Sequence, residues 1–540
     1  MAKECRQAVS KWGMVSTASD TATQAGVKML EKGGNAVDAA VAAAFCLGVT
    51  EPQASGLGGQ SMVLLHLAGE NRTLALDGSS RAPFSVNPER LPSEPVKVGI
   101  TAATLPSTPA VLGYLLDRYG SLTLQEVLEP AIIAAEDGFR VTSLHHKLLM
   151  RESDKLLADP LVKDKFFTGA CALKAGDLLR QPELANCLKQ MVRAGWQDFY
   201  HGEIAAAIIK DMKTRGGLLS QVDFSQIPFP LERPVLWGSY RQMELATFPP
   251  PGAGRALIQI LNILENFDPA ELEPGRPLST LILALAFRAA LRDRERMPVD
   301  PDLYWQSMEK KMVDKEYAGK IAARLREITA RCSRFGWRAP PTSGETTHLC
   351  TADIKGNVVG ITQSIELVFG SKTIAQGLGF FYNNYMSAYD YHDMTHPYYL
   401  LPGARPWSAV APTLFYKEQK PWLLLGSPGS QRIATSLAQI ITRVFDAGEG
   451  LDRAVDAPRL HADSSGKVQI EHKRFHPEVI DLLQHAGFHI SRRSAYSFFL
   501  GCVQAVMVPL KQGGYFYGVA DPRRDGCAQG PQKQPKEKRR

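Results

Sequence analysis

The sequence pattern changes from linker-like to strand-like close to a threonine about two-thirds of the way along the chain. Residues 343–350 read SGETTHLC, and the preceding segment, 338–344, is rich in proline and small residues. Such a composition is typical of an exposed linker. Two strand-like runs follow, at 348–354 and 358–364, separated by a Lys-Gly-Asn tripeptide centred on Gly356. This pattern predicts a β-hairpin that turns near Gly356.

The predicted hairpin fixes the surroundings of Thr346. If the turn is near Gly356, the numbers of paired positions sum to about 711, so Thr346 lies opposite the segment from Ser364 to Glu366. A hydroxyl and a carboxylate side chain would then flank it. A threonine at a strand start is, by itself, simply a good strand residue. The hairpin alone therefore assigns no chemistry to Thr346.

The remainder of the chain mixes helix and strand patterns. From Asp20 a helical pattern runs to the helix-breaking pair Gly33-Gly34, and Asn35 followed by Asp38 is typical of a capped second helix. Further predicted elements are a hairpin over 62–78, helices over most of 110–215, a helix over 257–267, and strands over 421–425 and 503–508. Periodicity alone predicts a mixed α/β chain.

Composition and charge narrow the class of protein. The chain has 540 residues, of which 44% are hydrophobic and 22% charged, as in ordinary globular proteins. The net charge is +7, but the last ten residues carry five basic side chains and one acidic. We therefore predict no nucleic-acid partner and a flexible tail over 527–540. No secretory signal or membrane-spanning run is visible, which predicts a cytoplasmic protein with no membrane partner.

Metal chemistry is not predicted. The eight cysteines form no CxxC motif, and His392 and His396 lack a clear third ligand. We expect most of the cysteines to be small buried hydrophobic residues, and the segment 391–404 to be an ordinary aromatic loop.

Several motifs together resemble one enzyme family. They are GMVSTASDTATQAGVKMLEKGGNAVDAAVAAAFCLGVTEPQASGLGG, PPPGAGRALIQILNILENFD, TTHLCTADIKGNVVGITQS, GFFYNNYM, RPWSAVAPTL, GSPGSQRI, DAPRLH and GVADPR. Along nearly its whole length the chain is similar to the gamma-glutamyltransferase (glutathione hydrolase) family of N-terminal-nucleophile hydrolases. The resemblance implies an α/β (α+β) fold, a four-layer αββα sandwich, and no cofactor or metal. It also implies a precursor that cuts itself between Glu345 and Thr346.

The two products of that cut are a large subunit, 1–345, and a small subunit, 346–540, which together build one αββα unit. These subunits are each other's expected partners, and the remaining partner is a small-molecule amide. The oligomeric state stays open, and a homo-oligomer of processed heterodimers is compatible with the sequence.

Thr346 suits the implied chemistry. A threonine hydroxyl is a poor nucleophile until a base takes its proton, and a newly freed α-amine has a pKa of about 7.7 to 8.0. One residue can therefore supply both the nucleophile and its base. Before scission, the same hydroxyl can attack the Glu345 carbonyl, which moves the acyl group from nitrogen to oxygen and leaves an ester for water to hydrolyse.

The resemblance places further catalytic residues around Thr346. Ser364 matches a hydroxyl residue that hydrogen-bonds the nucleophile. Gly429 and Ser430 match two backbone N–H groups that form an oxyanion hole, and removing one such donor typically costs roughly 3 to 4 kcal/mol. Ser430 stands where the family has a second glycine, which keeps the N–H but narrows the accessible backbone conformations.

The glutamyl pocket departs from the family pattern. The position of the arginine that binds the substrate α-carboxylate is Ser79 here, and the nearest arginine is Arg81. Arg81 either reaches the carboxylate, since arginine is long, or is a surface turn residue.

The positions that hold the substrate α-amino group also differ. They correspond to Glu366, Tyr385 and Ala388; Glu366 can replace a lost acceptor, whereas Ala388 cannot hold an ammonium group. Of two serines after an Arg-Pro pair, Ser408 remains and Ala409 replaces the other. We list Arg81, Glu366, Tyr385 and Ser408 as candidate substrate-binding residues.

Three functions are compatible with this sequence. The first is a gamma-glutamyl hydrolase or transferase that splits a glutathione-like γ-amide through an acyl-Thr346 ester. The second is an amidohydrolase for another small amide, such as oxamate, which has no α-ammonium group. The third is a noncatalytic scaffold of the same fold, which the intact TTH and GSPG elements argue against.

Overall fold

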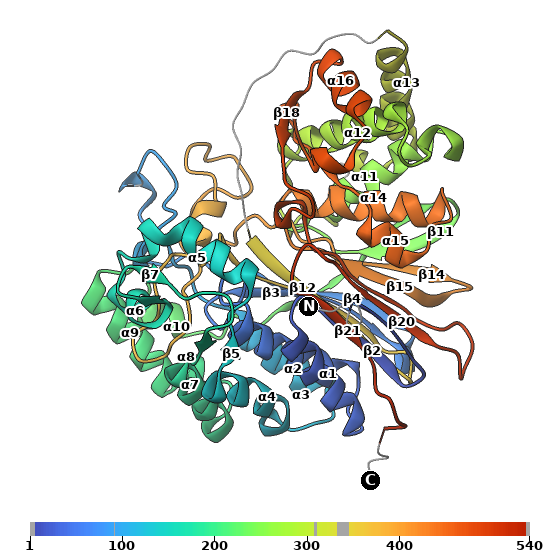
Figure 1. Cartoon of the computed structure of the whole chain (residues 1–540). Helices are drawn as coiled ribbons and strands as arrows, with labels where there is room; N and C mark the ends of the chain where they lie inside the picture. Colours follow the sequence, from blue (N-terminus) through green and yellow to red (C-terminus); the bar gives the residue numbers. More distant parts are fainter. Residues whose placement is uncertain (1–5, 91, 307–309, 332–344, 536–540) are drawn as a thin grey trace.

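Two seven-stranded sheets form the centre of the molecule (Figure 1). The computed structural model describes residues 6–90, 92–306, 310–331 and 345–535, so the predicted linker at 338–344 lies outside the described residues. The first sheet has the order β1 (Gln7–Ser10), β20 (Phe516–Ala520), β19 (Gln504–Met507), β15 (Lys420–Gly426), β14 (Thr413–Lys417), β11 (Met243–Thr247) and β10 (Leu236–Tyr240). The second has the order β21 (Cys527–Gln529), β2 (Gly13–Thr17), β12 (Glu345–Asp353), β13 (Val358–Glu366), β3 (Gln60–Leu67), β4 (Arg72–Gly78) and β9 (Leu231–Pro234).

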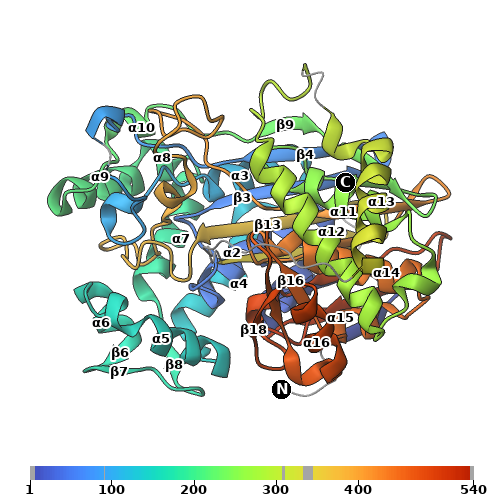
Figure 2. The same cartoon turned by 90° about the horizontal axis from the view of Figure 1, so that it is seen from above.

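Helices cover the outer face of each sheet, as the two views show (Figures 1 and 2). On the second sheet lie α1 (Asp20–Glu31), α2 (Ala36–Thr50), α3 (Thr108–Tyr119), α4 (Leu124–Asp137), α7 (Pro182–Ala194), α8 (Asp198–His201) and α9 (Glu203–Arg215), with α5 (Ser143–Leu156), α6 (Pro160–Phe166) and α10 (Gln221–Phe224) nearby. On the first sheet lie α11 (Gly254–Leu264), α12 (Pro277–Arg296), α13 (Lys315–Arg331), α14 (Arg432–Phe445), α15 (Leu451–Asp456) and α16 (Pro477–His485). A small sheet of β16 (Leu460–Ala462), β17 (Lys467–Ile470) and β18 (His489–Arg492) accompanies them. The architecture is the predicted αββα sandwich.

Strand alternation explains why both faces of the central sheets are buried. Along β3, Val63 and Leu65 join the core beneath the helices, whereas Met62 and Leu64 join the core between the sheets. Successive side chains of a strand point to opposite faces. A strand covered on both faces is therefore mainly apolar, which accounts for the run MVLL; the buried His66 that follows is hydrogen-bonded to Thr73.

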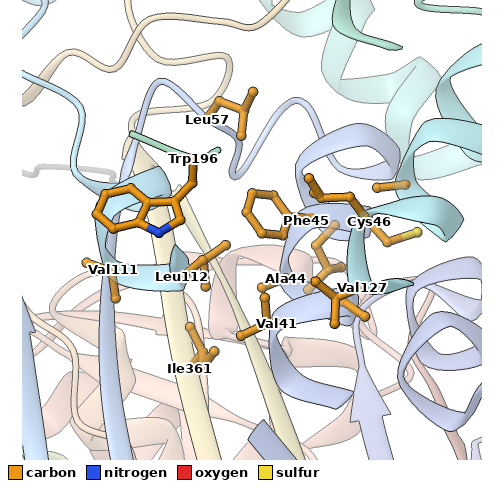
Figure 3. Close-up of a cluster of buried hydrophobic side chains, with 14 of the residues drawn as sticks. Val41, Ala44, Phe45, Cys46, Leu57, Val111, Leu112, Val127, Trp196 and Ile361 are labelled. Atoms are coloured by element: carbon orange, nitrogen blue, oxygen red, sulfur yellow. The ribbon is translucent and has the colours of Figure 1, made fainter. Parts of the chain in front are cut away.

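The alanine-rich helix α2 is packed on nearly all sides. Asn35 caps it as predicted: its side chain accepts hydrogen bonds from the N–H groups of Val37 and Asp38, and the Asp38 carboxylate accepts one from the Asn35 N–H. Small side chains let neighbouring elements approach closely. Figure 3 shows this core, with Val41, Ala44, Phe45 and Cys46 of α2 lying among Leu57, Val111, Leu112, Val127, Trp196 and Ile361.

The predicted hairpin forms, and its register is one residue from the prediction. Thr347 pairs with Gln363 and Cys350 with Gly360 across β12 and β13. The register shifts between Glu345 and Thr347, so the first residue of β12 pairs with Glu366. Thr346 therefore lies opposite a β-bulge in β13, a feature that re-aims side chains and is frequent beside active sites.

The prediction of a flexible tail over 527–540 is wrong for its first residues. Cys527–Gln529 form β21, which pairs with β2, and Cys527 and Ala528 are fully buried. Three residues are too few to show a strand periodicity, so the pairing partner, not the local sequence, determines this strand. No helix within the described ranges is both long and apolar enough to cross a membrane.

Candidate active site

Thr346 lies buried at the end of the central hairpin. It is 5% exposed, and its hydroxyl lies 3.4 Å from the Ser364 Oγ, which is also 5% exposed. The hairpin pairing predicted this proximity. On the other side of Ser364, the segment around Gly59 passes directly against β13, since a Cβ added at Gly59 would lie 2.3 Å from the Ser364 carbonyl oxygen.

The Ser364 hydroxyl is held in place by its neighbours. Its Oγ accepts a hydrogen bond from the Glu366 N–H at 2.9 Å, and the Tyr385 side chain hydrogen-bonds Ser364 and Gln60. Burial raises the pKa of Tyr385, so its phenol stays protonated. Tyr385 thus lies in the cavity wall with Thr346 and helps to position the Ser364 hydroxyl.

A buried charged network supports the other side of Thr346. Arg524 donates from Nη1 to the Thr346 carbonyl oxygen at 2.8 Å and lies 3.7 Å from the Glu51 carboxylate. The Thr347 hydroxyl donates to the other oxygen of Glu51 at 2.5 Å. These contacts hold the chain at Thr346 and Thr347. The sequence prediction missed them, although Glu51 and Arg524 fall within or beside motifs that carry the family resemblance.

Gly429 and Ser430 form the loop that precedes α14. Gly429 has a φ of 126° and Ser430 a φ of 53°. Their carbonyl oxygens accept the hydrogen bonds of the first helical residues, Arg432 and Ile433, but within the described residues neither of their own N–H groups has an acceptor. The N-terminus of a helix favours negative charge. The loop can therefore stabilise an oxyanion. Its conformation places Ser430 in the left-handed region, which is strained for a serine.

One cavity of about 460 Å³ joins these elements. Thr346, Ser364 and Ser430 line it, and so do three of the four candidate substrate-binding residues, Glu366, Tyr385 and Ser408. Gly429 is adjacent through the chain without lining the cavity. The structure thus brings together most of the residues that the sequence singled out.

Arg81 is the exception. It is absent from the cavity lining, and its backbone forms an isolated bridge with Leu105. Ser79, at the family's arginine position, donates both its N–H and its hydroxyl to the Asp77 carboxylate. That carboxylate also pairs with Arg233 at 2.9 Å. The side chains of Ser79, Asp77 and Arg233 therefore bind one another.

Glu366 occupies an unusual position in the cavity wall. It is half-buried and has a φ of 76°, in the left-handed region that non-glycine residues rarely adopt. Burial raises the pKa of its carboxyl to about 7, while the positive charge of Arg432 opposes the rise. Glu366 can therefore change charge near neutral pH.

The segment after Tyr391 forms an aromatic wall. The His396 and Tyr398 rings stack on Trp407 with centroid distances of 6.0 and 5.4 Å. His396 and Trp407 line the cavity with Ala388 and Ala409, whereas His392 is exposed on the surface. In the part of the chain that the structure describes, no group of three or more His, Cys, Asp or Glu residues could hold a metal ion.

Comparison with known proteins places this geometry in a family. The model of the gamma-glutamyltranspeptidase family matches residues 22–530. The chain belongs to the gamma-glutamyltranspeptidase family. This match covers every strand of the two central sheets except β1 and β2, and all residues that line the cavity.

The family relatives include both glutathione hydrolases and acylases. The glutathione hydrolase proenzyme of Escherichia coli is 34% identical, with 95% of this chain and 91% of the relative covered. The acylase ACY 1 proenzyme of Pseudomonas sp. strain V22 is also 34% identical, with 87% and 85% covered. These relatives are proenzymes of hydrolases, so the present member of the gamma-glutamyltranspeptidase family is an enzyme of the same general kind.

Solved structures confirm the N-terminal-nucleophile hydrolase fold. The cephalosporin acylase from Bacillus halodurans superposes with a TM-score of 0.89 at 27% identity, covering 99% of this chain and 98% of that chain. The gamma-glutamyltranspeptidase of Helicobacter pylori gives a TM-score of 0.52 at 34% identity, covering 57% of this chain and 89% of that chain.

Proposed function

We propose that this chain is a self-cleaving, gamma-glutamyltransferase-like amidohydrolase that works through an acyl-Thr346 intermediate. The arrangement that carries the proposal is the buried Thr346 hydroxyl opposite a β-bulge in β13, 3.4 Å from Ser364, in the cavity that Ser430 also lines. Nucleophile, orienting hydroxyl and oxyanion donors are the parts that acyl transfer requires.

The first reaction is the scission of the chain itself. The Thr346 hydroxyl attacks the carbonyl carbon of Glu345, the C–N bond breaks, and the acyl group moves to oxygen as an ester. Water then hydrolyses the ester, which leaves a carboxyl on Glu345 and a free amine on Thr346. The products are the subunits 1–345 and 346–540.

The second reaction uses the amine that the first one frees. The α-amine takes the hydroxyl proton as Thr346 attacks the substrate amide, and the N–H groups of Gly429 and Ser430 stabilise the tetrahedral oxyanion. The proton passes to the leaving amine, which departs and leaves the acyl-Thr346 ester. Water, or an amino acceptor, then takes the acyl group and restores the free threonine.

The first candidate substrate class is a gamma-glutamyl amide of the glutathione type. It is supported by the relatives named glutathione hydrolase proenzymes. Its α-ammonium group would need a negative acceptor, for which Glu366 is the candidate on the cavity wall.

The second candidate class is a small amide whose acyl group has no α-ammonium group. Two features of the cavity support it: Ala388 offers no side-chain acceptor, and the buried Tyr385 side chain is engaged with Ser364 and Gln60. Oxamate belongs to this class. The similarity to an acylase proenzyme is compatible with it.

The experiment compares release of 4-nitroaniline from its γ-glutamyl amide with release of ammonia from oxamate by the purified protein. Turnover of either substrate, lost in Thr346→Ala and kept in part by Thr346→Ser, is the expected result. The better substrate decides between the two classes. If the purified protein hydrolyses neither compound and no member of a wider panel of small amides, the result would contradict the proposal and support a noncatalytic scaffold.

A further inference from the structure

The molecule has a second cavity, apart from the one that Thr346 lines. Its volume is about 490 Å³, and the two cavities share no lining residue. Side chains of α1, of the C-terminal half of α4 and of the segment that leads into α5 form most of its wall. A volume of this size is typical of sites for small molecules. Neither reaction proposed above uses this cavity.

The wall of the second cavity has an excess of negative charge. It contains four carboxylates and two basic side chains, which are Asp20, Glu51, Asp137, Asp525, Lys28 and Arg140. Lys28 pairs with Glu129 at 2.9 Å, and Arg140 donates to the Gly176 carbonyl oxygen at 2.8 Å. Neither of these two partners lines the cavity. The two cations are therefore engaged outside the cavity, which increases the excess of acceptors within it.

Two buried side chains in the same wall lack hydrogen-bond partners. His145 is 2% exposed and neither of its ring nitrogens is hydrogen-bonded; Gln53 is 5% exposed, and its Oε1 accepts no hydrogen bond from any residue that the structure describes. Burial lowers the pKa of His145 to about 4, so at neutral pH its ring is uncharged and one nitrogen is an acceptor. A buried polar group without a partner is costly. A ligand that donates hydrogen bonds would supply the missing partners.

The arrangement of these groups suits an organic cation better than a metal ion. Among the described residues, no three His, Cys, Asp or Glu side chains are grouped so that they could hold a metal. Burial raises the pKa of Asp525, and the Thr142 side chain and the charge of Arg524 oppose the rise. A further cation in the cavity would favour the ionised form of this carboxyl. Ile133 and Phe139 add apolar surface to the wall.

We propose that the second cavity binds a small organic diamine and that its occupancy affects Thr346 through Glu51. The ammonium groups of the diamine donate to the carboxylates and to the unpartnered acceptors of Gln53 and His145, with charge-assisted hydrogen bonds. Its methylene chain packs on Ile133 and Phe139. The binding site stands by itself, whereas the effect on turnover rests on the amidohydrolase function proposed above.

Glu51 connects the second cavity to Thr346. Its carboxylate accepts a hydrogen bond from the Thr347 hydroxyl at 2.5 Å and lies 3.7 Å from Arg524, which donates to the Thr346 carbonyl oxygen at 2.8 Å. An ammonium group beside Glu51 competes with Arg524 for the negative charge of the carboxylate. We therefore expect the bound diamine to weaken the contacts that hold Thr346 and to lower kcat by roughly fivefold.

Calorimetry with 1,4-diaminobutane on the purified protein tests the binding site. We expect one saturable site per chain, and at least roughly tenfold weaker binding of 1,4-butanediol, which has the same length without the charges. Absence of binding, or equal binding of the diol, would overturn the site. Magnesium chloride that displaces the diamine at equal concentration would show a general attraction of cations and would also contradict the proposal.

A pair of double variants locates the site. Asp20→Asn with Asp525→Asn removes two charges from the wall and should weaken binding of 1,4-diaminobutane by at least roughly tenfold. The matched control is Glu31→Gln with Asp154→Asn, which removes two exposed acidic charges outside the lining and should leave the affinity unchanged. Equal losses in the two double variants would show that only the net charge of the protein matters.

His145→Phe separates recognition from structure. The substitution keeps an aromatic ring among Phe139, Phe166 and Phe369 and removes two nitrogens that have no partner. The free energy of unfolding without ligand should therefore not fall, whereas the affinity for the diamine should fall by at least roughly threefold. An unchanged affinity would remove His145 from the site and contradict its role as an acceptor.

Steady-state kinetics test the effect on Thr346. With the better substrate of the two classes, 1,4-diaminobutane should lower kcat of the wild type but not of the Asp20→Asn, Asp525→Asn double variant. A rise in turnover that persists in this variant would show the diamine acting as an amino acceptor in the Thr346 cavity, and would overturn the coupling. If the protein hydrolyses no amide, the proposed function fails, and the calorimetric comparison still decides the binding site.

Discussion

Two parts of the wall of the Thr346 cavity are built from different kinds of structure. Around Thr346, the proposed nucleophile, the main features belong to the backbone: the bulge in β13 opposite Thr346 and the left-handed loop of Gly429 and Ser430 before α14. In the second part, the features are side chains from a loop and a helix terminus, namely Trp407 and Arg294. Under the proposed function, substitutions in the side-chain part should change substrate preference without disturbing the sheets, whereas changes in the backbone part should abolish the reaction.

The largest effect is expected at Thr346, the proposed nucleophile. Thr346→Ala should abolish amide hydrolysis, with kcat falling by at least about 1000-fold, since no other residue supplies both hydroxyl and amine. Thr346→Ser should keep measurable turnover, because it retains both groups. Steady-state kinetics on the better of the two substrate classes measures this. Full activity in Thr346→Ala would show that Thr346 is not the nucleophile.

The next effect is expected in the oxyanion loop. Gly429→Ala puts a side chain at a φ of 126°, where L residues are strained, and should displace the N–H groups that we propose as oxyanion donors. We expect kcat to fall roughly 10- to 100-fold with KM changed little. A loss that appears only in KM would assign the loop to substrate binding instead of transition-state stabilisation.

A pH-dependent effect on stability is expected at Glu366. The pKa of its carboxyl is raised to about 7 in the folded protein, so the ionised form destabilises the fold. This cost is absent below the unfolded pKa, grows between about pH 4.5 and 7, and is full above pH 7. Glu366→Gln should therefore gain about 1 to 3 kcal/mol of unfolding free energy relative to wild type between pH 5 and pH 8.

Denaturant unfolding at the two pH values measures this gain. Glu418→Gln is the matched control, since Glu418 also has a positive φ, of 53°, but is exposed at a hairpin turn. A difference between Glu366→Gln and wild type that does not vary with pH would show that Glu366 keeps its charge in the fold.

The smallest effect is expected at Ser430. Its φ of 53° strains a serine by about 1 to 2 kcal/mol, but glycine loses more chain entropy on folding. Ser430→Gly should therefore change the unfolding free energy by less than about 1 kcal/mol, and kcat by less than about threefold, because the N–H remains. A loss of activity similar to that of Gly429→Ala would instead assign a catalytic role to the Ser430 side chain.

The sequence predicted the part of the cavity around Thr346 better than the part around Trp407 and Arg294. The hairpin around Gly356, the capping of α2 by Asn35 and the proximity of Thr346 and Ser364 followed from local patterns, although the register of the hairpin differs from the prediction by one residue. Such features depend on turn chemistry and strand pairing, which neighbouring residues determine. The family resemblance then supplied the four layers, which periodicity could not.

The part of the cavity around Trp407 and Arg294 could not be predicted from local patterns. Arg294 lies within the sequence RDRER, which is typical of a solvated helix end, yet it is buried in the structure, where it packs on Trp407 and bonds the Ser408 carbonyl oxygen. Arg81 was selected by its position in the chain, yet the structure leaves it off the cavity wall. Long-range packing decides both cases, as it does for β21, whose strand pairs with β2.

The most direct test of the central claim is the intact mass of the purified protein under denaturing conditions, together with its N-terminal residues. We predict two chains that meet at the Glu345–Thr346 bond, the second beginning with a free threonine, and a single uncut chain for Thr346→Ala. A wild-type protein that stays uncut after long incubation, or one cut at another bond, would contradict the assignment of Thr346 as an N-terminal nucleophile.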